Sequence, residues 1–372
     1  MEVKTKAGLY IHFPFCIRKC SYCHFYSIKK DSNQIKKWMN GIFKEMDFYD
    51  EEFEFDTVYL GGGSPSLLEN DLIEKFFAKI YHKFPFKFKE ITIEAIPFKE
   101  YHETLKLWRK IGIDRISIGV QSFLKEELKI LEREYSPEDV IDFYGKAREA
   151  GFENINLDFL IGIPNQNLKK WKKNFDFISL LHPEHVSIYI LESLEDTEFK
   201  KIHGDFQKEE EIEELFFGIE DWLISLGYYH YEISNYAKKG MESLHNLKYW
   251  NDQPFIGIGP SASSYNLKSR WENIDDFSLW IKLLEAGKKP IKQISFLTDE
   301  EILKDAILMG LRKIEGLNIK KYEDVTGENI REKFESKWKE LSDLDLIEID
   351  KETIKIKRKK LLLANEVFRE FI

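Results

Sequence analysis

An α/β fold with a largely parallel sheet is predicted for the first half of this chain of 372 residues. Six apolar segments alternate with stretches of helical periodicity, and that alternation predicts parallel β/α units. Hydrophobic residues make up 43% and charged residues 33% of the chain, which is typical of a globular protein that buries a core. Chirality and layer rules favour a curved sheet with helices outside it. They leave open whether this sheet forms a barrel or an open, doubly wound sheet.

The elements of the first half follow one another without long interruptions. Strands are expected at residues 6–13, 55–60, 90–95, 115–120, 154–160 and 185–191. Helices are expected at residues 33–53, 70–83, 100–111, 137–150 and 168–181. The helical pattern is clearest in the first of these segments, where one apolar stripe contains Ile35, Trp38, Met39, Ile42, Phe43 and Met46.

The pattern changes after about residue 195. Residues 205–226 have the spacing of an acidic amphipathic helix, and a glycine-rich turn at 257–262 leads to a strand or loop. From residue 298 the sequence predicts helices followed by short strands around Ile347 and Ile354, beginning with an N-cap at Thr298. We therefore expect three parts, which are residues 1–195, 196–297 and 298–372.

The three cysteines of the chain lie close together, as Cys16, Cys20 and Cys23. An odd number of thiols at this spacing does not form a disulfide framework, so they are better explained as ligands of one soft metal centre. We favour an iron–sulfur cluster, because such clusters take thiolates from short cysteine runs. A zinc site would need a fourth ligand from His12 or His24, and no second cysteine pair completes it. Three thiolates would leave one iron of a four-iron cluster free to bind a small molecule.

Other residues with chemical potential fall at the ends of predicted strands. The glycines 61–63 follow one strand directly, where they allow a close backbone approach and present N–H groups to an anion. Taken alone, such a triplet is most often a tight turn. Glu94, Gln121 and Asp158 end three further strands, and Asp158 is an acid in an otherwise apolar segment. In β/α barrels the chemistry sits at the carboxyl ends of the strands.

The cysteine spacing, with Tyr22 directly before the third cysteine, resembles the radical S-adenosylmethionine (SAM) superfamily. The flanking sequences LYIHFPFC and YCHFYS are similar to one branch, which contains the oxygen-independent coproporphyrinogen III oxidase HemN and its relative, the haem chaperone HemW. The resemblance implies an α/β fold with a partial (β/α)6 barrel and a C-terminal, mainly helical, winged-helix-like domain. It also implies a [4Fe–4S] cluster on Cys16, Cys20 and Cys23, with SAM chelating the open iron.

The resemblance further implies which residues bind cofactors. The stretch GGGSPSLL is similar to the family's GGGTPSLL, whose role is to hold the amino end of SAM. The chain departs from the family pattern at Ile96, where asparagine is usual, and at Asn165, where glycine is usual. The positions that the resemblance assigns to cofactor binding are Tyr10, Tyr22, Gly61, Gly62, Gly63, Ser64, Glu94, Gln121, Arg133, Asp158 and Glu192.

His245 lies in the segment SLHNLKYW and has two possible roles. A histidine flanked by aromatic residues is most often packed and hydrogen-bonded in a core. The family's HNxxYW segment is, however, the place proposed to contact haem, and imidazole is a common axial ligand of haem iron. Both roles stay open for His245. Arg18 and Lys19 could likewise raise the cluster's potential, meet haem propionates or be solvated.

Two absences favour the HemW-like branch. The oxidase branch usually has a further cysteine where this chain has His24-Phe25, and it has a long N-terminal arm where only 15 residues precede Cys16. We therefore expect a protein that binds a [4Fe–4S] cluster, SAM and haem and delivers haem to an acceptor protein, with an electron donor for the cluster. The alternative is an oxygen-independent coproporphyrinogen III dehydrogenase, which decarboxylates its substrate to protoporphyrinogen IX. A non-catalytic zinc module is a third and weaker hypothesis.

Composition excludes some functions and favours a compartment. The net charge of −10 argues against general nucleic-acid binding, which requires clustered lysine and arginine. Residues 1–10 lack the apolar region of a signal peptide, and no apolar run is long enough for a membrane span. Thiols without a pairing pattern fit a reducing compartment, so we expect a cytoplasmic protein.

Overall fold

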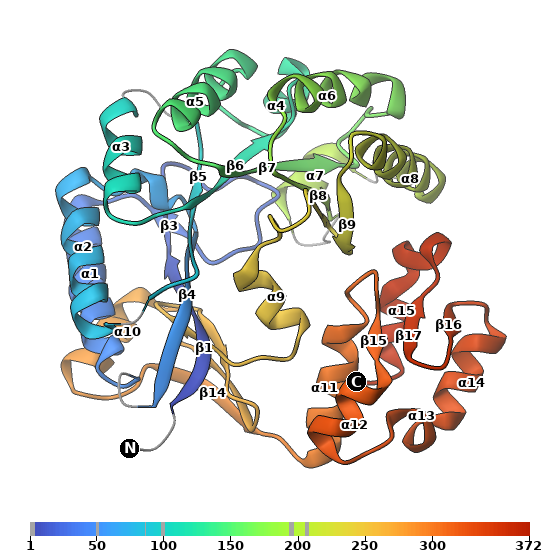
Figure 1. Ribbon diagram of the computed structural model, residues 1–372. Helices are drawn as coiled ribbons and strands as arrows, with labels where there is room; N and C mark the ends of the chain where they lie inside the picture. Colours follow the sequence, from blue (N-terminus) through green and yellow to red (C-terminus); the bar gives the residue numbers. More distant parts are fainter. Residues whose placement is uncertain (1–3, 50–51, 86, 98–100, 193–196, 205–207) are drawn as a thin grey trace.

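The computed structural model describes residues 4–49, 52–85, 87–97, 101–192, 197–204 and 208–372. Within these residues one sheet of 12 strands forms the body of the molecule (Figure 1). Its strand order is β14-β13-β12-β11-β1-β4-β5-β6-β7-β8-β10-β9. The α/β fold class is confirmed.

The six predicted strands form the parallel centre of this sheet, each beside the next in chain order. They are β1 (Thr5–Phe13), β4 (Phe53–Gly62), β5 (Glu90–Ala95), β6 (Arg115–Gln121), β7 (Asn154–Ile161) and β8 (His185–Ile190). The sheet curves, and helices cover its convex face (Figure 1). These helices are α1 (Ser32–Met46), α2 (Asn70–Lys83), α3 (His102–Lys110), α4 (Lys125–Ile130), α5 (Pro137–Glu149) and α6 (Leu168–Leu181).

Alternation along the strands explains why one face of the sheet is apolar. In β1 the side chains of Leu9, Ile11 and Phe13 are buried in the core, where Phe13 meets Trp38 of α1 edge-on at 5.1 Å. Tyr10 and His12 point to the opposite, concave face, because successive strand residues alternate in direction. The helices therefore bury the apolar set, and the concave face receives the polar set.

Some predicted boundaries are wrong or lie outside the described residues. The first helix ends at Met46 instead of residue 53, because Phe53 and Phe55 already alternate with polar residues as part of β4. Strand β4 also runs through Gly61 and Gly62, two residues beyond the predicted end at Leu60. The predicted helix parts at 50–51, 100 and 205–207 and the predicted boundary at 195/196 lie outside the described residues. The division into three parts stays a prediction.

Both edges of the parallel centre carry further strands. Of these, the sequence predicts only a strand or loop after the turn at 257–262, and the first two residues of that turn belong to a strand. Strand β11 (Phe255–Ile258) pairs parallel with β1 and continues into the antiparallel strands β12 (Ser263–Tyr265), β13 (Ser269–Asn273) and β14 (Ile291–Phe296). On the other edge, β10 (Asn235–Ala237) and β9 (Tyr229–Glu232) add an antiparallel hairpin to β8. Helix α10 (Phe277–Glu285) packs against α1.

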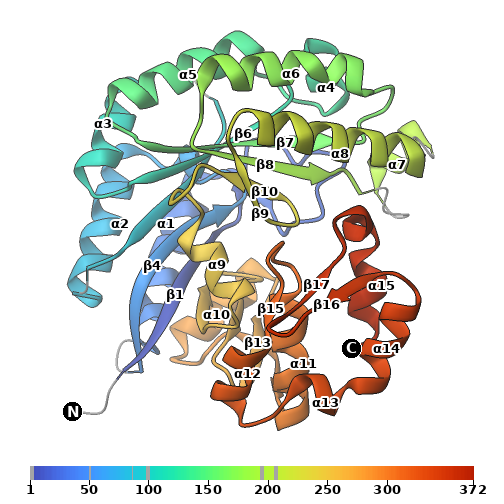
Figure 2. The ribbon, with the colours of Figure 1, turned by 45° about the vertical axis from the view of Figure 1, so that its right-hand side comes forward.

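The remaining helices of this part lie between strands of the sheet in the chain, two of them between β8 and β9 and one between β10 and β11. They are α7 (Glu198–His203), α8 (Glu209–Ser225) and α9 (Leu244–Trp250). Helix α9 contacts β1, β4 and α11, so it stands between the sheet and the C-terminal elements (Figure 2).

The C-terminal part has the predicted order of helices followed by short strands. Thr298 and Glu301 form a capping box at the start of α11, as the N-cap prediction required. The order is α11 (Asp299–Gly310), β15 (Leu317–Asn318), α12 (Ile319–Thr326), α13 (Ile330–Lys333), α14 (Glu335–Asp343), β16 (Ile347–Ile349), β17 (Thr353–Ile356), a short 3-10 helix (Arg358–Leu363) and α15 (Ala364–Arg369). Among the helices of the described residues, we find none with the length and hydropathy needed to cross a bilayer.

Candidate cluster and cofactor site

The cysteine loop begins where β1 ends and is closed by a small bridge of two strands. Strand β2 (Phe15–Cys16) pairs parallel with β3 (Ile28–Lys29), and the Lys30 N–H donates to the Cys16 carbonyl at 2.8 Å. Between them the Cys23 N–H donates to the Cys20 carbonyl at 3.0 Å. The loop is therefore tied at its base and folded on itself at its tip, and it presents three half-buried thiols.

The environment of the thiols suits a metal centre. Burial raises the pKa of the Cys16 and Cys23 thiols, and the charge of Cys20 adds to both shifts. The Ser64 hydroxyl donates to Cys16 Sγ at 3.9 Å. Three crowded thiolates are thus costly without a cation, and binding iron relieves that cost by replacing the protons.

The donor set fits an iron–sulfur cluster. The three thiols lie in one short loop, and the charge of Cys20 acts on both Cys16 and Cys23. Iron–sulfur clusters are held by cysteine thiolates from such short runs. In the described residues, no three His, Cys, Asp or Glu side chains are placed to hold one metal ion.

The glycine stretch packs directly against the cysteine loop. The Gly63 N–H donates to the Phe13 carbonyl at 2.7 Å, and the Ser64 N–H donates to the Phe15 carbonyl at 2.9 Å. A Cβ on Gly63 would lie 2.6 Å from the Phe15 carbonyl oxygen, so no larger residue fits there. These N–H groups are therefore occupied within the chain, and the stretch serves to bring β4 close to the cluster loop.

Glu94 is the centre of a small buried network at the end of β5. Its Oε2 accepts from the Gly62 N–H at 2.9 Å, and its Oε1 accepts from the Tyr59 hydroxyl at 3.0 Å. Burial raises the pKa of Glu94 to about 7, so this carboxyl exchanges its proton near neutral pH. Tyr59 was not identified from the sequence, although its place on the concave side of a strand could have indicated it.

Asp158 and Gln121 lie on the neighbouring strands β7 and β6. Asp158 accepts from the Ser117 hydroxyl at 2.9 Å and from Asn156 Nδ2 at 2.8 Å, and burial raises its pKa. Gln121 has a φ of 63° next to a bulge in the β6–β7 pairing. A left-handed conformation is costly for glutamine, and such strain persists mainly where function requires it.

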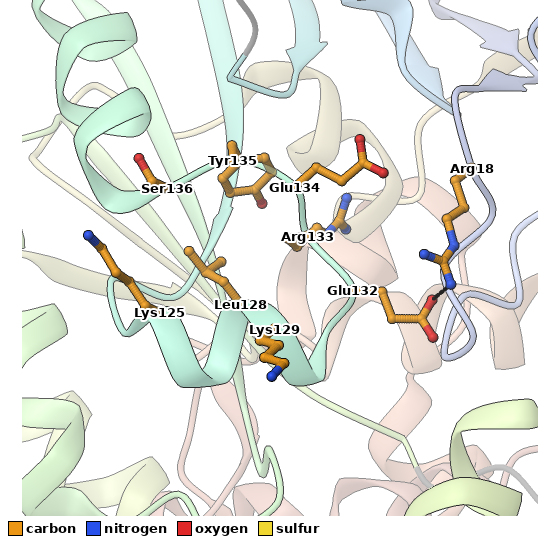
Figure 3. A pocket seen from close by; sticks show the side chains of 9 residues that line it. All are labelled: Arg18, Lys125, Leu128, Lys129, Glu132, Arg133, Glu134, Tyr135 and Ser136. Atoms are coloured by element: carbon orange, nitrogen blue, oxygen red, sulfur yellow. Dashed lines mark ion pairs between the residues drawn. The ribbon is translucent and has the colours of Figure 1, made fainter.

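Arg133 contacts the cysteine loop through Tyr22. Its Nε and Nη2 donate to the Tyr22 hydroxyl at 3.1 and 2.5 Å. The preceding residue, Glu132, accepts from the Ser21 N–H at 3.4 Å and pairs with Arg18 at 3.2 Å. Arg18 is thus not simply solvated. We call this pair, Glu132 and Arg133, the loop clasp; it lies at an open pocket of about 380 Å³ (Figure 3).

Two other predicted residues lie at different levels of the sheet. Tyr10 is half-buried on the concave face, where its hydroxyl hydrogen-bonds His12 Nδ1 at 3.1 Å. Glu192 is exposed just beyond β8, beside residues outside the described part. The geometry brings Glu94, Gln121 and Asp158 to one edge of the sheet with the cysteine loop, whereas Tyr10 lies deeper.

His245 is completely buried, and both of its ring nitrogens are occupied. Nδ1 bonds the Thr57 hydroxyl at 2.8 Å and Nε2 bonds the Tyr249 hydroxyl at 2.8 Å. Burial, with the charges of Lys248 and Arg115, lowers the pKa of His245 to about 3, so the ring is neutral. In this conformation neither nitrogen is free to bind iron.

His245 is also remote from the cysteines along the strands. It packs on Gly8 and Thr57, near the middle of β1 and β4, whereas the cysteine loop leaves the end of β1. Five residues of extended strand separate Gly8 from Phe13, which is roughly 16 Å. The packed role of the histidine is therefore the one that its surroundings support.

The departure at Asn165 has a simple structural reason. Asn165 has a φ of 64°, a conformation that glycine adopts freely and asparagine tolerates better than other residues. The turn after β7 therefore keeps its geometry without glycine. At the other departure, the Ile96 N–H donates to the Ser66 hydroxyl at 3.3 Å.

A cysteine-loop cluster site at the carboxyl edge of a β/α sheet defines a class of protein. The family model of the radical SAM superfamily matches residues 10–178, and that of the HemN C-terminal domain matches residues 297–363. The chain is a radical SAM protein, of the class that uses a [4Fe–4S] cluster and SAM.

Curated relatives narrow this class. Heme chaperone HemW of Bacillus subtilis strain 168 is 31% identical over 372 residues, covering 98% of each chain. Heme chaperone HemW of Escherichia coli K12 is 32% identical over 261 residues, covering 68% of this chain and 69% of that one. The chain belongs to the HemW family.

A solved structure shares the fold. Coproporphyrinogen III oxidase HemN of Escherichia coli aligns with 99% of this chain and 90% of its own, with a TM-score of 0.87. Its sequence identity is 21%, so this likeness shows the fold alone.

Proposed function

We propose that this protein binds haem and delivers it to an acceptor protein, while holding a [4Fe–4S] cluster and SAM. The observation that carries the proposal is the match along nearly the whole chain to proteins named Heme chaperone HemW. The free thiols suit a reducing compartment, so we place this activity in the cytoplasm. An electron donor for the cluster and a haem-accepting protein are the partners that this function requires.

The residues present fit the two resident groups. Cys16, Cys20 and Cys23 would hold the cluster, and when SAM is bound to it the pair supplies one-electron chemistry. Glu94 would accept a hydrogen bond from a ligand ammonium or hydroxyl in its ionised form, because an ionised carboxylate has only acceptors. Gln121 and Asp158 would hold the nucleoside end at the neighbouring strand ends.

Haem ligation by His245 would require a rearrangement. The bonds to Thr57 and Tyr249 must break, and α9 must move away from β1 and β4, before a ring nitrogen reaches iron. His245→Ala separates the two roles. Loss of the Soret band with unchanged stability would indicate ligation, whereas lower stability with an unchanged spectrum would indicate packing.

The test is a haem titration followed by a transfer assay. Cluster-reconstituted protein is titrated with haem under anaerobic conditions, and the complex is then mixed with an apo-haemoprotein. We expect a saturable Soret change and haem transfer to the acceptor. A protein that holds its cluster and SAM but gives no saturable haem binding would contradict the proposal.

A further inference from the structure

The concave face of the sheet is lined by polar side chains. The pairing of neighbouring strands aligns Glu94 with Ser117, Ser117 with Asn156, and Asn156 with His185 across four strands. The intervening residues of these strands, such as Ile93 and Ile116, are buried against the helices. Such a polar face is unusual, because parallel strands are commonly apolar on both sides.

Part of the concave face is accessible. Tyr10, Tyr59, Asp158 and Tyr249 keep accessible surface, and Tyr189 of β8 is 39% exposed. The strand residues among them alternate with residues buried against the helices of the convex face (Figure 1), so their accessible surface is on the concave side. We call this accessible surface the inner chamber and define it by these five residues.

Arg115 is the first residue of β6 and lies on the same concave face as Ser117. It is 2% exposed, and its Nε is buried without a hydrogen bond. Within the described part of the chain, no acceptor hydrogen-bonds its guanidinium and no carboxylate lies within ion-pair distance. A desolvated charge in this state is costly, and proteins rarely keep one without a partner.

The two carboxylates whose charges act on Arg115 are Glu90 and Asp158, and both accept hydrogen bonds from other groups. Glu90 accepts from the N–H groups of Leu244 and His245 at 2.9 and 3.0 Å, so it caps helix α9. Asp158 accepts from Ser117 and Asn156. Their charges act on Arg115 from a distance, but they leave its planar fork of donors free.

We propose that Arg115 is the anchor for a carboxylate of a ligand held in the inner chamber. This inference rests on the proposed function, and the ligand is the tetrapyrrole, whose propionates carry the carboxylates. The guanidinium fork matches a carboxylate in two parallel hydrogen bonds. The walls of Tyr10, Tyr59 and Tyr249 offer aromatic faces to a flat macrocycle.

SAM is a second source of a carboxylate, and position favours the tetrapyrrole. The amino-acid end of SAM is expected at the cluster, beyond the carboxyl ends of the strands. Arg115 is the first residue of β6, at the opposite end of that strand. The experiment must nevertheless measure both ligands.

The test compares haem with its dimethyl ester, in which both propionates are masked. Arg115→Gln is expected to weaken haem binding about tenfold and to leave binding of the diester and of SAM unchanged. Arg115→Lys keeps the charge without the fork and should lose about threefold. Arg331→Gln removes an exposed arginine of α13 and serves as the matched control. Thermal unfolding of each variant checks that it is folded, and Arg115→Lys carries the test if Arg115→Gln is not.

Each outcome decides between the alternatives. If Arg115→Gln weakens binding of haem and of the diester equally, or if it leaves haem affinity unchanged, Arg115 is not the propionate anchor. The proposed function would then still stand. Weaker SAM binding with unchanged haem binding would assign Arg115 to SAM and overturn the tetrapyrrole. A wild-type protein that binds no haem would contradict the proposed function together with the anchor.

Discussion

The cysteines of the loop depend on one another, because the negative charge of one thiolate raises the pKa of a neighbouring thiol. A bound cation removes this repulsion. The same loop is half-buried, tied at its base by β2 and β3, and held at its tip by the loop clasp. A change in one thiol should therefore remove the metal centre and leave the fold intact.

The first prediction concerns Cys20. Cys20→Ser should lose the cluster and reduce SAM binding at least tenfold, since SAM needs the open iron. Its thermal unfolding should change little. Iron and sulfide analysis with a SAM titration measures both. His24→Ala is the control, because His24 is an exposed neighbour. Loss of metal in that control would revive the zinc module, with His24 as its fourth ligand.

Some of these residues could be predicted from the sequence, and Arg115 could not. The cysteine spacing predicts the cluster ligands by itself, and strand periodicity predicts that Glu94 and Asp158 lie toward the carboxyl ends of two parallel strands, which are β5 and β7. Arg115 looks like a solvated charge at the start of a strand. Its lack of a partner depends on where Glu90 and Asp158 place their hydrogen bonds, and local sequence does not carry that information.

Among the elements around the site, the turn after α4 contacts the cysteine loop. The loop clasp follows α4, and Glu132 has a φ of 56°, a left-handed conformation that costs a glutamate free energy. Glu132 adopts this conformation nevertheless, and in it the carboxylate contacts the Ser21 N–H and Arg18. We infer that the clasp positions the cysteine loop.

Glu132→Ala should loosen that loop. Losing one hydrogen bond and one partly exposed ion pair is worth about 0.5–1 kcal/mol, so the cluster should be lost roughly two- to fivefold faster in air. Decay of the cluster's visible absorbance measures this rate. Glu132→Gln keeps the acceptor for Ser21 and should lie between the two. Identical decay of Glu132→Ala and wild type would show that the clasp does not position the loop.

Glu45 joins α1 to the edge of the sheet. It is fully buried, and its carboxyl accepts from the Gly259 N–H at 2.9 Å, from Trp280 Nε1 at 3.0 Å and from Asn273 Nδ2. Burial raises the pKa of Glu45 to about 8. Because the folded state then holds a proton that the unfolded state releases, this group's contribution is complete at acid pH and is lost as the pH rises toward 8.

The pH dependence of unfolding should therefore change in Glu45→Gln. Between pH 5 and 8 a single such group contributes a slope of up to about 1.4 kcal/mol per pH unit. Denaturant unfolding at several pH values should show a shallower decline in Glu45→Gln than in wild type. Glu285→Gln removes an exposed acid of the adjacent α10 and should keep the wild-type slope. Parallel curves for Glu45→Gln and wild type would show that Glu45 is ionised in the fold.

Local pattern predicts elements well where they are long and periodic, as for α2, α6 and β5. It fails where distant pairing decides the structure. Phe255–Ile258 is short and contains Gly257, yet it forms strand β11 because it pairs with β1. Phe255 pairs with Gly8, which lies about 247 residues earlier in the chain. Strand formation of this kind depends on a partner more than on intrinsic preference.

At the scale of the whole molecule, the C-terminal part is held against the sheet by charges and aromatic contacts. Arg358 pairs with Glu220 at 2.9 Å and with Asp221 at 2.5 Å, both on α8. Arg312 lies over the rings of Trp250 and Phe368 at 4.8 and 5.3 Å. The C-terminal elements thereby contact α9, whose Tyr249 lines the inner chamber, and Figure 2 shows this side of the molecule.

Arg358→Ala should weaken this attachment. Glu220 is 2% exposed, and removing its arginine leaves a buried carboxylate with only His230, which costs about 1–3 kcal/mol. Limited proteolysis should cleave the C-terminal elements faster. Arg369→Ala is the matched control, since its partner Glu366 lies on the same helix. Equal protection of both variants would show that Arg358 does not hold the attachment.

We propose that this protein carries haem and does not decarboxylate a porphyrinogen. The deciding assay incubates cluster-reconstituted protein under anaerobic conditions with SAM, a reductant and coproporphyrinogen III, followed by chromatography for porphyrins and 5′-deoxyadenosine. We expect no protoporphyrinogen from a preparation that binds and transfers haem in parallel. Protoporphyrinogen formed together with 5′-deoxyadenosine would overturn the proposed function and assign the protein to the oxidases.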